Sequence, residues 1–491
     1  MEAHTHSVRE GETGFVTEAK GYLLNLEGLP SVHVNDVIVN TRGQRALVTA
    51  LKTETVEALL LDRNDPEVGD RFMLHTQGIK FSFGEHLFGR IINTLGDPLD
   101  GKEGSMPPQN NSLKIEVRAP GMSSRLAMTE QLMTGMATID VLLPIAKGQR
   151  QLVIGPISSG KTTFLESVIA HQKGSPMVCI YAFIGRPVVY VEDTVSRILS
   201  EKGNKNAIIL ASFSDEPAPM IYLTPTVALG LAEFFSSKGS DVLLVLDDLG
   251  SHAKYLREIA LLSGRIPGRE SYPGDMFYQH AHLLERAGYF NKNIGGGSIT
   301  ILPILETNIE DITNLVSTNL MSATDGHLFF SPLLHSEGHF PAVLTGQSVT
   351  RVGRQTQSNL AKQLSIRVQA LLAEYERQRG YSQFGTQLSE STRHIITQGE
   401  FMQVFLRQEP LDSVPLEVQI ILLSLVFTAL FNNRDIAFAE RNYGALIKVT
   451  GTSKAIQPVV ESARRGTISL DQFFKKVESV LPYFEAVCQQ Q

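Results

Sequence analysis

The spacing of apolar residues divides the chain into three textures. Residues 1 to about 80 alternate short apolar runs with turn residues, as in GYLLNLEGL and HVNDVIV, and this period-two pattern predicts a small antiparallel barrel. From about 81 to 365, apolar strands alternate with helical segments, which is typical of a mostly parallel sheet covered on both faces. After about 366, apolar residues at i, i+3 and i+4 predict helices. We therefore expect a multidomain protein with a β-barrel (1–80), an α/β domain (81–365) and an all-α bundle (366–491).

The stretch GPISSGKT, Gly155 to Thr162, has the spacing of a phosphate-binding loop. The apolar run QLVIG precedes it and the helical pattern TTFLESVIAHQ follows it, so strand, loop and helix come in the order that the motif requires. In such a loop, backbone N–H groups approach the phosphates, Lys161 reaches the β and γ oxygens, and Thr162 ligates Mg²⁺. The predicted nucleotide-binding residues here are Gly155, Pro156, Ile157, Ser158, Ser159, Gly160, Lys161, Thr162 and Thr163.

A second motif, DVLLVLDD, lies about eighty residues downstream, at Asp241 to Asp248. An apolar run that ends in acid suits a parallel strand that delivers Asp247 or Asp248 towards Mg²⁺. An ordinary core strand followed by a capping aspartate has the same pattern. Together the two motifs predict binding of ATP or ADP with Mg²⁺, with Asp247 as the second metal ligand beside Thr162. Neither motif says whether hydrolysis follows.

Composition excludes some classes of protein. The 44 Lys and Arg against 51 Asp and Glu give a net charge of -7, which provides no overall attraction to nucleic acid. Cys179 and Cys488 lie far apart and lack the clustered spacing of a zinc site or a disulfide scaffold. The N-terminal segment has neither a secretory nor a transit composition, and the apolar stretch VQIILLSLVFTALF is too short to span a bilayer. We expect no signal peptide and no membrane span, and we expect that stretch to be a buried helix.

Several passages resemble landmarks of rotary ATP synthase catalytic-head subunits, namely TGMATIDVLLPIAKGQRQLVIG, RIPGRESYPGDMFYQHAHLLERAG, GGGSITILPILET and SATDGHLFFSP. That family has a catalytic beta and a largely regulatory alpha subunit, and this chain resembles alpha. The passages at 346–353 (GQSVTRVG), 376–388 (ERQRGYSQFGTQL) and 407–419 (RQEPLDSVPLEVQ) are similar to alpha segments, and LLVLDDLGSHA is closer to the alpha pattern. The resemblance implies the same three-part fold.

The resemblance also implies roles and partners. Arg351 would reach across an interface into the site of a neighbouring subunit as an arginine finger, which neutralises transition-state charge. Gln408 would bind nucleotide near the adenine. The implied partners are a catalytic beta-type subunit alternating in a ring of three plus three, a gamma-type central stalk, peripheral-stalk subunits and a membrane sector that moves hydrogen or sodium ions. The implied location is the cytoplasmic face of a bacterial membrane, in a peripheral complex that does not bind nucleic acid.

Position 186 departs from the family pattern. After the glycine that ends the strand following the loop helix, beta subunits have a glutamate and alpha subunits a glutamine, but here Arg186 follows Gly185. An arginine stays protonated and cannot act as a base, and we expect Glu192 and Asp193 to lie on a solvated helix face. We therefore predict that this chain holds nucleotide without turning it over. Further departures are Ile157 and Ser158 in the loop, Glu409, Pro410 and Leu411 after Gln408, and a barrel pattern that starts by about residue 14, which predicts an altered peripheral-stalk attachment.

Two other functions remain open at this stage. A self-sufficient homohexameric ATPase, either a secretion motor or an RNA translocase, needs its own base in every subunit, which Arg186 removes. An RNA translocase also needs basic or aromatic contacts, and the barrel pattern holds few aromatics. A nucleotide-responsive structural subunit with a degenerate site differs from the alpha-type role only in whether Lys161 matters.

Overall fold

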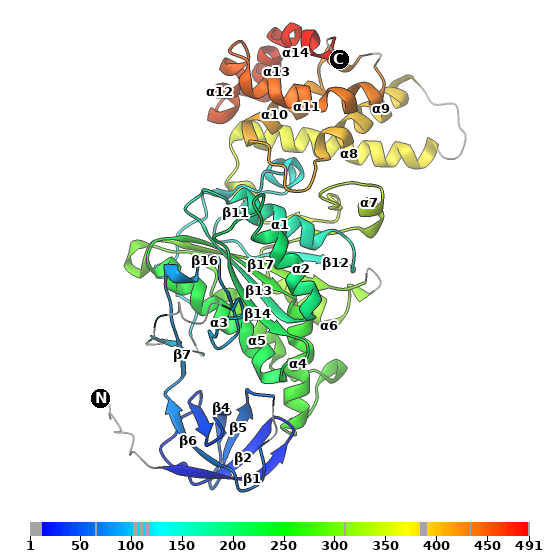
Figure 1. Ribbon diagram of the computed structural model, residues 1–491. Coiled ribbons are helices and arrows are strands. Elements are labelled where there is room, and N and C mark those ends of the chain that lie inside the picture. The colour runs from blue at the N-terminus through cyan, green and yellow to red at the C-terminus, as the bar shows by residue number, and fades with distance from the viewer. Residues whose placement is uncertain are drawn as a thin grey trace. The chain divides into compact units, whose positions relative to one another are not determined.

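The computed structural model describes residues 12–63, 66–101, 107, 111–113, 115, 117–308, 311–382, 390–432 and 434–489 (Figure 1). Its internal contacts group the chain into two compact units. The first unit holds residues 1–126 and 173–324, and the second holds residues 127–172 and 325–491. The phosphate-loop motif belongs to the second unit, and the acidic strand motif belongs to the first.

The first unit begins with a closed barrel whose neighbouring strands are antiparallel, in the order β1-β2-β5-β4-β3-β6. Its strands are β1 (Thr13–Lys20), β2 (Leu23–Glu27), β3 (Val37–Asn40), β4 (Arg45–Leu51), β5 (Val56–Leu60) and β6 (Arg71–Thr76). Apolar side chains from all six strands, such as Val16, Ile38 and Phe72, fill its interior. The predicted antiparallel barrel is confirmed.

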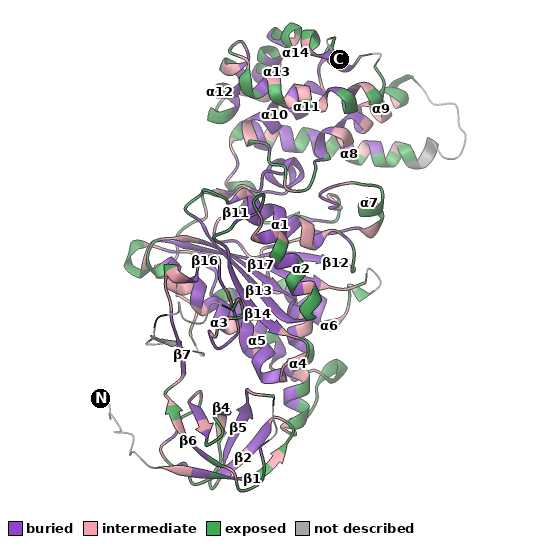
Figure 2. Ribbon diagram, viewed as in Figure 1, coloured by how far each residue is buried: buried purple, intermediate pink, exposed green. Residues whose placement is uncertain are grey.

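The same unit contains a parallel sheet in the order β17-β15-β13-β14-β8, with β16 antiparallel on β17. Its strands are β8 (Ile91–Ile92), β13 (Val178–Arg186), β14 (Ile208–Phe213), β15 (Asp241–Asp247), β16 (Gly288–Tyr289) and β17 (Ser298–Glu306). Every residue of β13 is buried (Figure 2), as the continuous apolar runs predict for strands covered on both faces. The short strands β7 (Ile79–Phe81) and β9 (Asn111–Leu113) pair separately.

Helices of the first unit follow the strands in alternation. They are α2 (Val188–Ile198), α3 (Ala218–Ser237), α4 (Leu249–Leu262), α5 (Met276–Glu285) and α6 (Leu315–Ala323). By length and composition α3 could cross a membrane, but 72% of its most apolar window is buried inside the protein, where it packs on β13, β14 and β15. Such a helix forms the core of the unit. The apolar pattern of α3 is longer than that of VQIILLSLVFTALF, the stretch that the sequence analysis considered as a membrane span.

The second unit contains strand β12 (Gln151–Gly155) parallel to β18 (Gly326–Phe329), which pairs in turn with antiparallel β19 (Val349–Thr350). Helix α1 (Lys161–His171) follows β12, and α7 (Pro332–Ser336) follows β18. The antiparallel pair of β10 (Gln131–Leu132) and β11 (Ile145–Ala146), with a π-helical turn at Thr138–Leu142 in the connection between them, completes this part.

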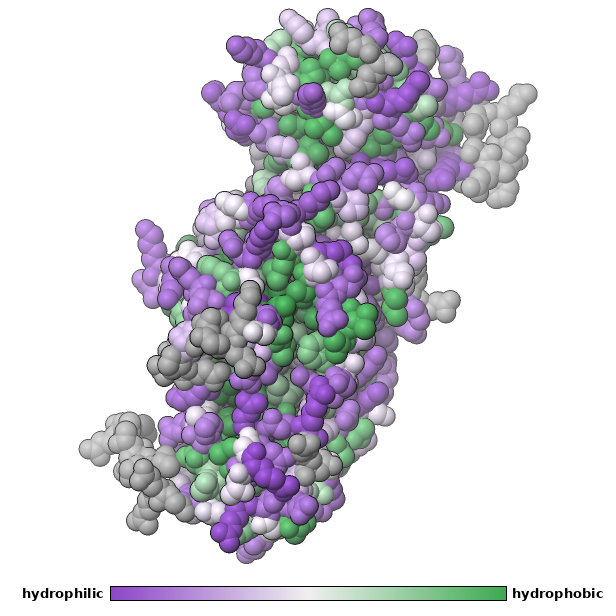
Figure 3. Space-filling view, in the orientation of Figure 1, coloured by the Kyte–Doolittle hydropathy of each residue, from purple (hydrophilic) through white to green (hydrophobic). Residues whose placement is uncertain are grey.

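Helices form the rest of the second unit, as predicted. They are α8 (Asn359–Ser382), α9 (Glu390–Leu406), α10 (Leu416–Leu425), α11 (Ile436–Thr452), α12 (Gln457–Arg465), α13 (Leu470–Ser479) and α14 (Leu481–Cys488). The predicted buried helix is α10, whose residues 418–425 are all buried. Figure 3 shows hydrophilic residues over much of the visible face of these helices. Residues 383–388 of the passage 376–388 lie outside the described residues.

Candidate functional site

The phosphate-loop motif forms a loop between the last residue of β12, Gly155, and the first residue of α1, Lys161. The predicted order of strand, loop and helix is confirmed. At Gly155 a Cβ atom would lie 2.7 Å from the backbone oxygen of Phe330. Gly160 has a φ of 86°, and a Cβ atom there would lie 3.0 Å from Nδ1 of His335. Both positions therefore require glycine, the first for space and the second also for its left-handed backbone.

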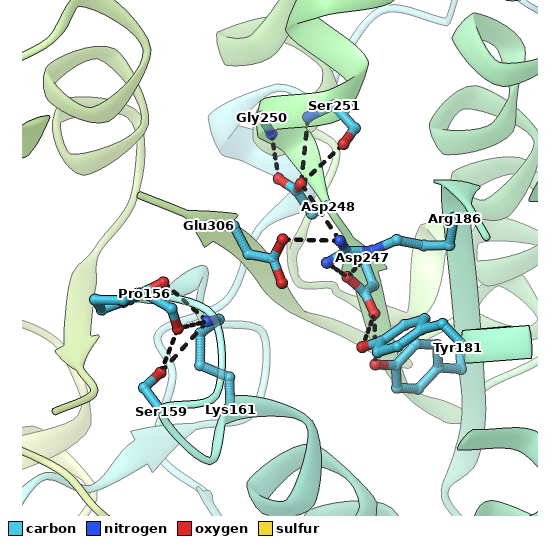
Figure 4. Close-up of polar contacts among 12 residues, drawn as sticks. Pro156, Ser159, Lys161, Tyr181, Arg186, Asp247, Asp248, Gly250, Ser251 and Glu306 are labelled. Atoms are coloured by element: carbon cyan, nitrogen blue, oxygen red, sulfur yellow. Dashed lines mark hydrogen bonds and ion pairs between the residues drawn. The ribbon is translucent and has the colours of Figure 1, made fainter. Parts of the chain in front are cut away.

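The ammonium of Lys161 lies inside its own loop. Its Nζ donates to the backbone oxygen of Gly155 at 2.8 Å, to that of Pro156, and to Oγ of Ser159 at 3.4 Å (Figure 4). Only 5% of the residue is exposed. Since these acceptors are uncharged, anionic phosphate oxygens could compete with them for the ammonium.

The first turn of α1 offers further donors to an anion. α1 begins at Lys161, directly after Gly160, and a helix N-terminus presents backbone N–H groups and a positive dipole end to a phosphate. Thr162 and Thr163 lie half-buried in this turn, whereas Ile157 is 73% exposed at the loop tip. The nine predicted loop residues are thus brought together on one strand–loop–helix unit.

Three adjacent parallel strands of the first unit end in charged residues. β13 ends at Arg186, its neighbour β15 at Asp247, and the next strand β17 at Glu306. The guanidinium of Arg186 donates through Nε to Oδ1 of Asp247 at 2.8 Å and through Nη2 to the same oxygen. Its Nη1 donates to Oε2 of Glu306 at 2.9 Å and lies 4.0 Å from Oδ2 of Asp248 (Figure 4). Arg186 therefore joins the carboxylates of all three acidic residues.

Asp247 is completely buried and its carboxylate is fully engaged. While Oδ1 accepts two hydrogen bonds from Arg186, Oδ2 accepts one from Tyr181 and one from Tyr190, each at 2.9 Å. A carboxylate offers about four lone-pair positions in total. All the acceptor positions of Asp247 are thus taken by protein donors.

Asp248 has a different local role. It is the N-cap of α4, where its carboxylate accepts from the backbone N–H groups of Gly250 and Ser251 and from Oγ of Ser251 at 3.0 Å. Burial raises the pKa of Asp248, an effect that the charge of Arg186 partly offsets. The capping aspartate that the sequence left as an alternative reading of DVLLVLDD is therefore found at this position.

Electrostatics keep Arg186 charged. Burial disfavours its charge, but the attraction of Asp247 and the contact with Glu306 outweigh burial and raise the pKa of Arg186 above its usual value. Arg186 thus acts as a permanent cation. Glu192 and Asp193 are exposed, as predicted, and Asp193 pairs with Arg197. None of these groups combines a free carboxylate with the buried position that a general base requires.

The structure places Arg351 directly after β19, where its side chain is exposed. Its backbone N–H donates to the oxygen of Asp325 at 3.1 Å, which fixes the start of this segment. Arg354 donates through Nη2 to Oε1 of Gln369 at 3.0 Å and is held against α8. The two arginines therefore differ, because the side chain of Arg354 is anchored within the unit.

Gln408 is buried and bonded to backbone. Its Oε1 accepts from the N–H of Ala137 at 2.7 Å, and its Nε2 donates to the oxygen of Gly135 at 2.9 Å. The residue before it, Arg407, lines a cavity of about 640 Å³ whose walls also include Thr138, Phe340, Pro341, Arg379 and Leu406. The sequence analysis missed this cavity because its walls come from four segments that lie far apart along the chain and meet only in the fold.

The chain was compared with known proteins. The family model described as ATP synthase alpha/beta family, nucleotide-binding domain, matches residues 135–350, and the model for the C terminal domain of the ATP synthase alpha/beta chain matches residues 357–471. One relative is ATP synthase subunit alpha 1 of Chlorobium luteolum, 36% identical over 413 residues, which cover 84% of this chain and 80% of the relative. Another is ATP synthase subunit alpha of Dictyoglomus turgidum, 33% identical over 487 residues, which cover 99% and 95%.

Proposed function

We propose a role for this chain on the basis of its relatives. It belongs to the ATP synthase alpha/beta family and matches alpha subunits over most of its length. We propose that it is the non-catalytic, regulatory alpha-type subunit in the head of a rotary, ion-translocating ATP synthase. In this role it holds a nucleotide and contributes to a neighbouring catalytic site. We also propose the functional division into domains at 1–80, 81–365 and 366–491.

The observation that carries the non-catalytic role is Arg186. Hydrolysis needs a group that orients and deprotonates the attacking water. At the strand end where that group is expected, this chain has a guanidinium that is bonded to Asp247 and Glu306. A permanent cation cannot accept a proton, and both acids beside it serve as its counter-ions. The chain therefore keeps its nucleotide intact.

Nucleotide binding is supported by the loop at 155–163. We propose that ATP or ADP places its phosphates on the N–H groups of this loop and on Lys161. The place of Gln408 near the adenine rests on the family resemblance alone, because its side-chain amide is bonded to the backbone of Ala137 and Gly135. Of the two predicted Mg²⁺ ligands, Thr162 fits, because it offers a hydroxyl in the first turn of α1. Asp247 does not fit, because four protein donors already occupy its oxygens.

The remaining roles concern partners. We propose that Arg351, exposed after β19, acts as an arginine finger in the site of a catalytic beta-type subunit when the interface between them closes. The ring would alternate the two subunits, three of each, around a gamma-type central stalk, with peripheral-stalk subunits and a membrane sector that moves hydrogen or sodium ions. The complex would lie on the cytoplasmic face of a bacterial membrane.

The test is to tag this chain in its native cells, purify it gently, identify the proteins that accompany it and record the intact mass. We expect an equimolar partner with a phosphate loop and the glutamate that this chain lacks, in a ring of six subunits. A ring made of this chain alone would contradict the proposal and favour a homohexameric motor. Purified alone, the chain should show negligible ATPase activity, and sustained turnover would also contradict the non-catalytic role.

A further inference from the structure

We infer that Arg186 is a built-in cation that replaces a divalent metal at Asp247, so that this chain binds its nucleotide without needing Mg²⁺. The inference rests on the proposed nucleotide binding and goes beyond it. In proteins with a phosphate loop, the metal is held between the Ser or Thr of the loop and an Asp at the end of a neighbouring strand. Here the Asp is present, but its partner is an arginine from the same sheet.

The register of the sheet brings the cation to the acid. β13 and β15 are parallel neighbours with Phe183 opposite Asp247, and Arg186, three residues further along, folds its guanidinium back onto that carboxylate (Figure 4). Oε2 of Glu306, at the end of the next strand, accepts a hydrogen bond from Nη1 of the guanidinium at 2.9 Å. The arrangement is therefore part of the fold and does not depend on a flexible surface pair.

A metal ion would have to displace these donors. Mg²⁺ binds carboxylate oxygens at about 2.0–2.1 Å with near-octahedral geometry, and it needs free lone pairs. Each oxygen of Asp247 already accepts two hydrogen bonds, from Arg186 on one side and from Tyr181 and Tyr190 on the other. Asp247 and Tyr181 are completely buried, so neither group can reach water when its partner leaves. Breaking such a buried pair would leave charge uncompensated.

The rest of the cluster does not supply a replacement site. Asp248 is used as the cap of α4, and Glu306 is paired with Arg186. Among the described residues, no group of three or more His, Cys, Asp or Glu side chains is arranged to hold a metal ion. A nucleotide bound by this chain therefore interacts with the loop N–H groups, Lys161 and Thr162, and its affinity does not depend on a metal held by Asp247.

The first arm of the test measures binding of Mn²⁺ alone to the full-length chain by electron paramagnetic resonance. Wild type and Asp247→Asn should bind the same number of ions, whereas Arg186→Gln should bind one more than wild type, because its acids have lost their cation. Arg186→Lys is the matched control, since it keeps the charge and should behave as wild type. Loss of an ion in Asp247→Asn would overturn the inference, and so would a folded Arg186→Gln chain that binds no additional ion.

The second arm measures the affinity of the full-length chain for ATP by calorimetry, in Mg²⁺ and in EDTA. The two dissociation constants should agree within about threefold. A weakening of about tenfold or more in EDTA would overturn the inference. Failure to bind ATP in either buffer would instead contradict the proposed nucleotide binding, and the Mn²⁺ measurement would still decide whether Arg186 has replaced a metal.

Discussion

The glycine loop and the strand ends are both parts of a phosphate-binding motif, but their polar groups are satisfied in different ways. In the loop, Lys161 donates to neutral oxygens of Gly155 and Pro156, and Ile157 of the same loop is exposed. At the strand ends, Arg186 is held by the carboxylates of Asp247 and Glu306. A phosphate can displace a neutral acceptor more readily than an ion pair can be broken. The contrast shows how one site can keep its binding function and lose its chemistry.

The largest expected effect separates the contributions of Arg351 and Lys161 to turnover. In the assembled complex, Arg351→Ala should lower multi-site ATP hydrolysis by about 10³-fold, because an arginine finger stabilises transition-state charge. Lys161→Ala should lower it by less than about tenfold, because the loop only holds nucleotide. Steady-state hydrolysis by complexes of verified composition would measure both changes. Equal damage from the two substitutions would point to a catalytic site in this chain.

The next effect concerns stability and tests whether the ion pairs of Arg186 stabilise the strand ends independently of the loop. Arg186→Ala leaves buried carboxylates without their cation and should destabilise the sheet by about 3–5 kcal/mol. Hydrogen exchange of peptides from β13 and β15, read by mass spectrometry, would measure the loss of protection. Arg186→Lys is the control and should lose less. Lys161→Ala should leave these peptides nearly unchanged, and a comparable loss there would contradict the contrast between the two regions.

Acid should act in opposite directions on one buried group in each unit, His252 in the first and Asp140 in the second. In the first unit, Nδ1 of His252 lies 3.1 Å from Nε2 of His280. Burial lowers the pKa of His252 to about 4 and that of His280 to about 3. Stability from a depressed histidine pKa is present above pH 6.5 and is lost as the pH falls towards 4. At pH 5 the loss should be about 2 kcal/mol for His252.

In the unit with the loop, burial raises the pKa of Asp140 to about 6 despite its hydrogen bonds from Thr134, Gly135 and Gln419. Stability from a raised carboxyl pKa is present below 3.8 and is lost as the pH rises through 6. Lowering the pH from 7 to 5 should therefore raise the free energy of unfolding by about 1 kcal/mol. Hydrogen exchange, corrected for the change of the intrinsic exchange rate with pH, should show that α4 loses protection and that residues 134–142 gain it. Asp140→Asn should remove only the second response, and a change of the same sign in α4 and in residues 134–142 would refute the prediction.

The smallest effect tests the loop itself. Ile157 is exposed at the tip of the loop, so the cation introduced by Ile157→Arg should tighten ATP binding by about threefold at low salt, and the gain should shrink as salt screens it. Ile157→Gln is the uncharged control. Calorimetry at two ionic strengths would measure the change, and a gain that persists in high salt would argue against a simple charge effect.

The sequence was sufficient for features that depend on local patterns. The barrel, the loop at 155–163 and the C-terminal helices follow from period-two alternation, glycine spacing and helical spacing, and all three are found. The contacts of Arg186 could not be predicted, because they depend on β13 lying beside β15 and β15 beside β17, an order that joins residues 61 and 120 positions apart. Similarly, the motif that suggested Asp247 as a metal ligand contains no sign of Tyr181 and Tyr190. The hydrogen bond between Gln408 and Ala137 joins residues 271 positions apart and depends on how the C-terminal helices, among them α8 and α10, pack on the π-helical turn.

The barrel has a consequence for how the chain meets its neighbours. Because β1 pairs with β6 as well as with β2, the sheet has no free margin at which another polypeptide could add a strand. Since these strands precede all the other elements along the chain, they can close during synthesis before the long parallel sheet is complete, a stage at which crowded nascent copies could otherwise cross-pair. Assembly with other subunits must then use side chains and loops, which can distinguish one partner from another, whereas backbone pairing is largely indifferent to sequence.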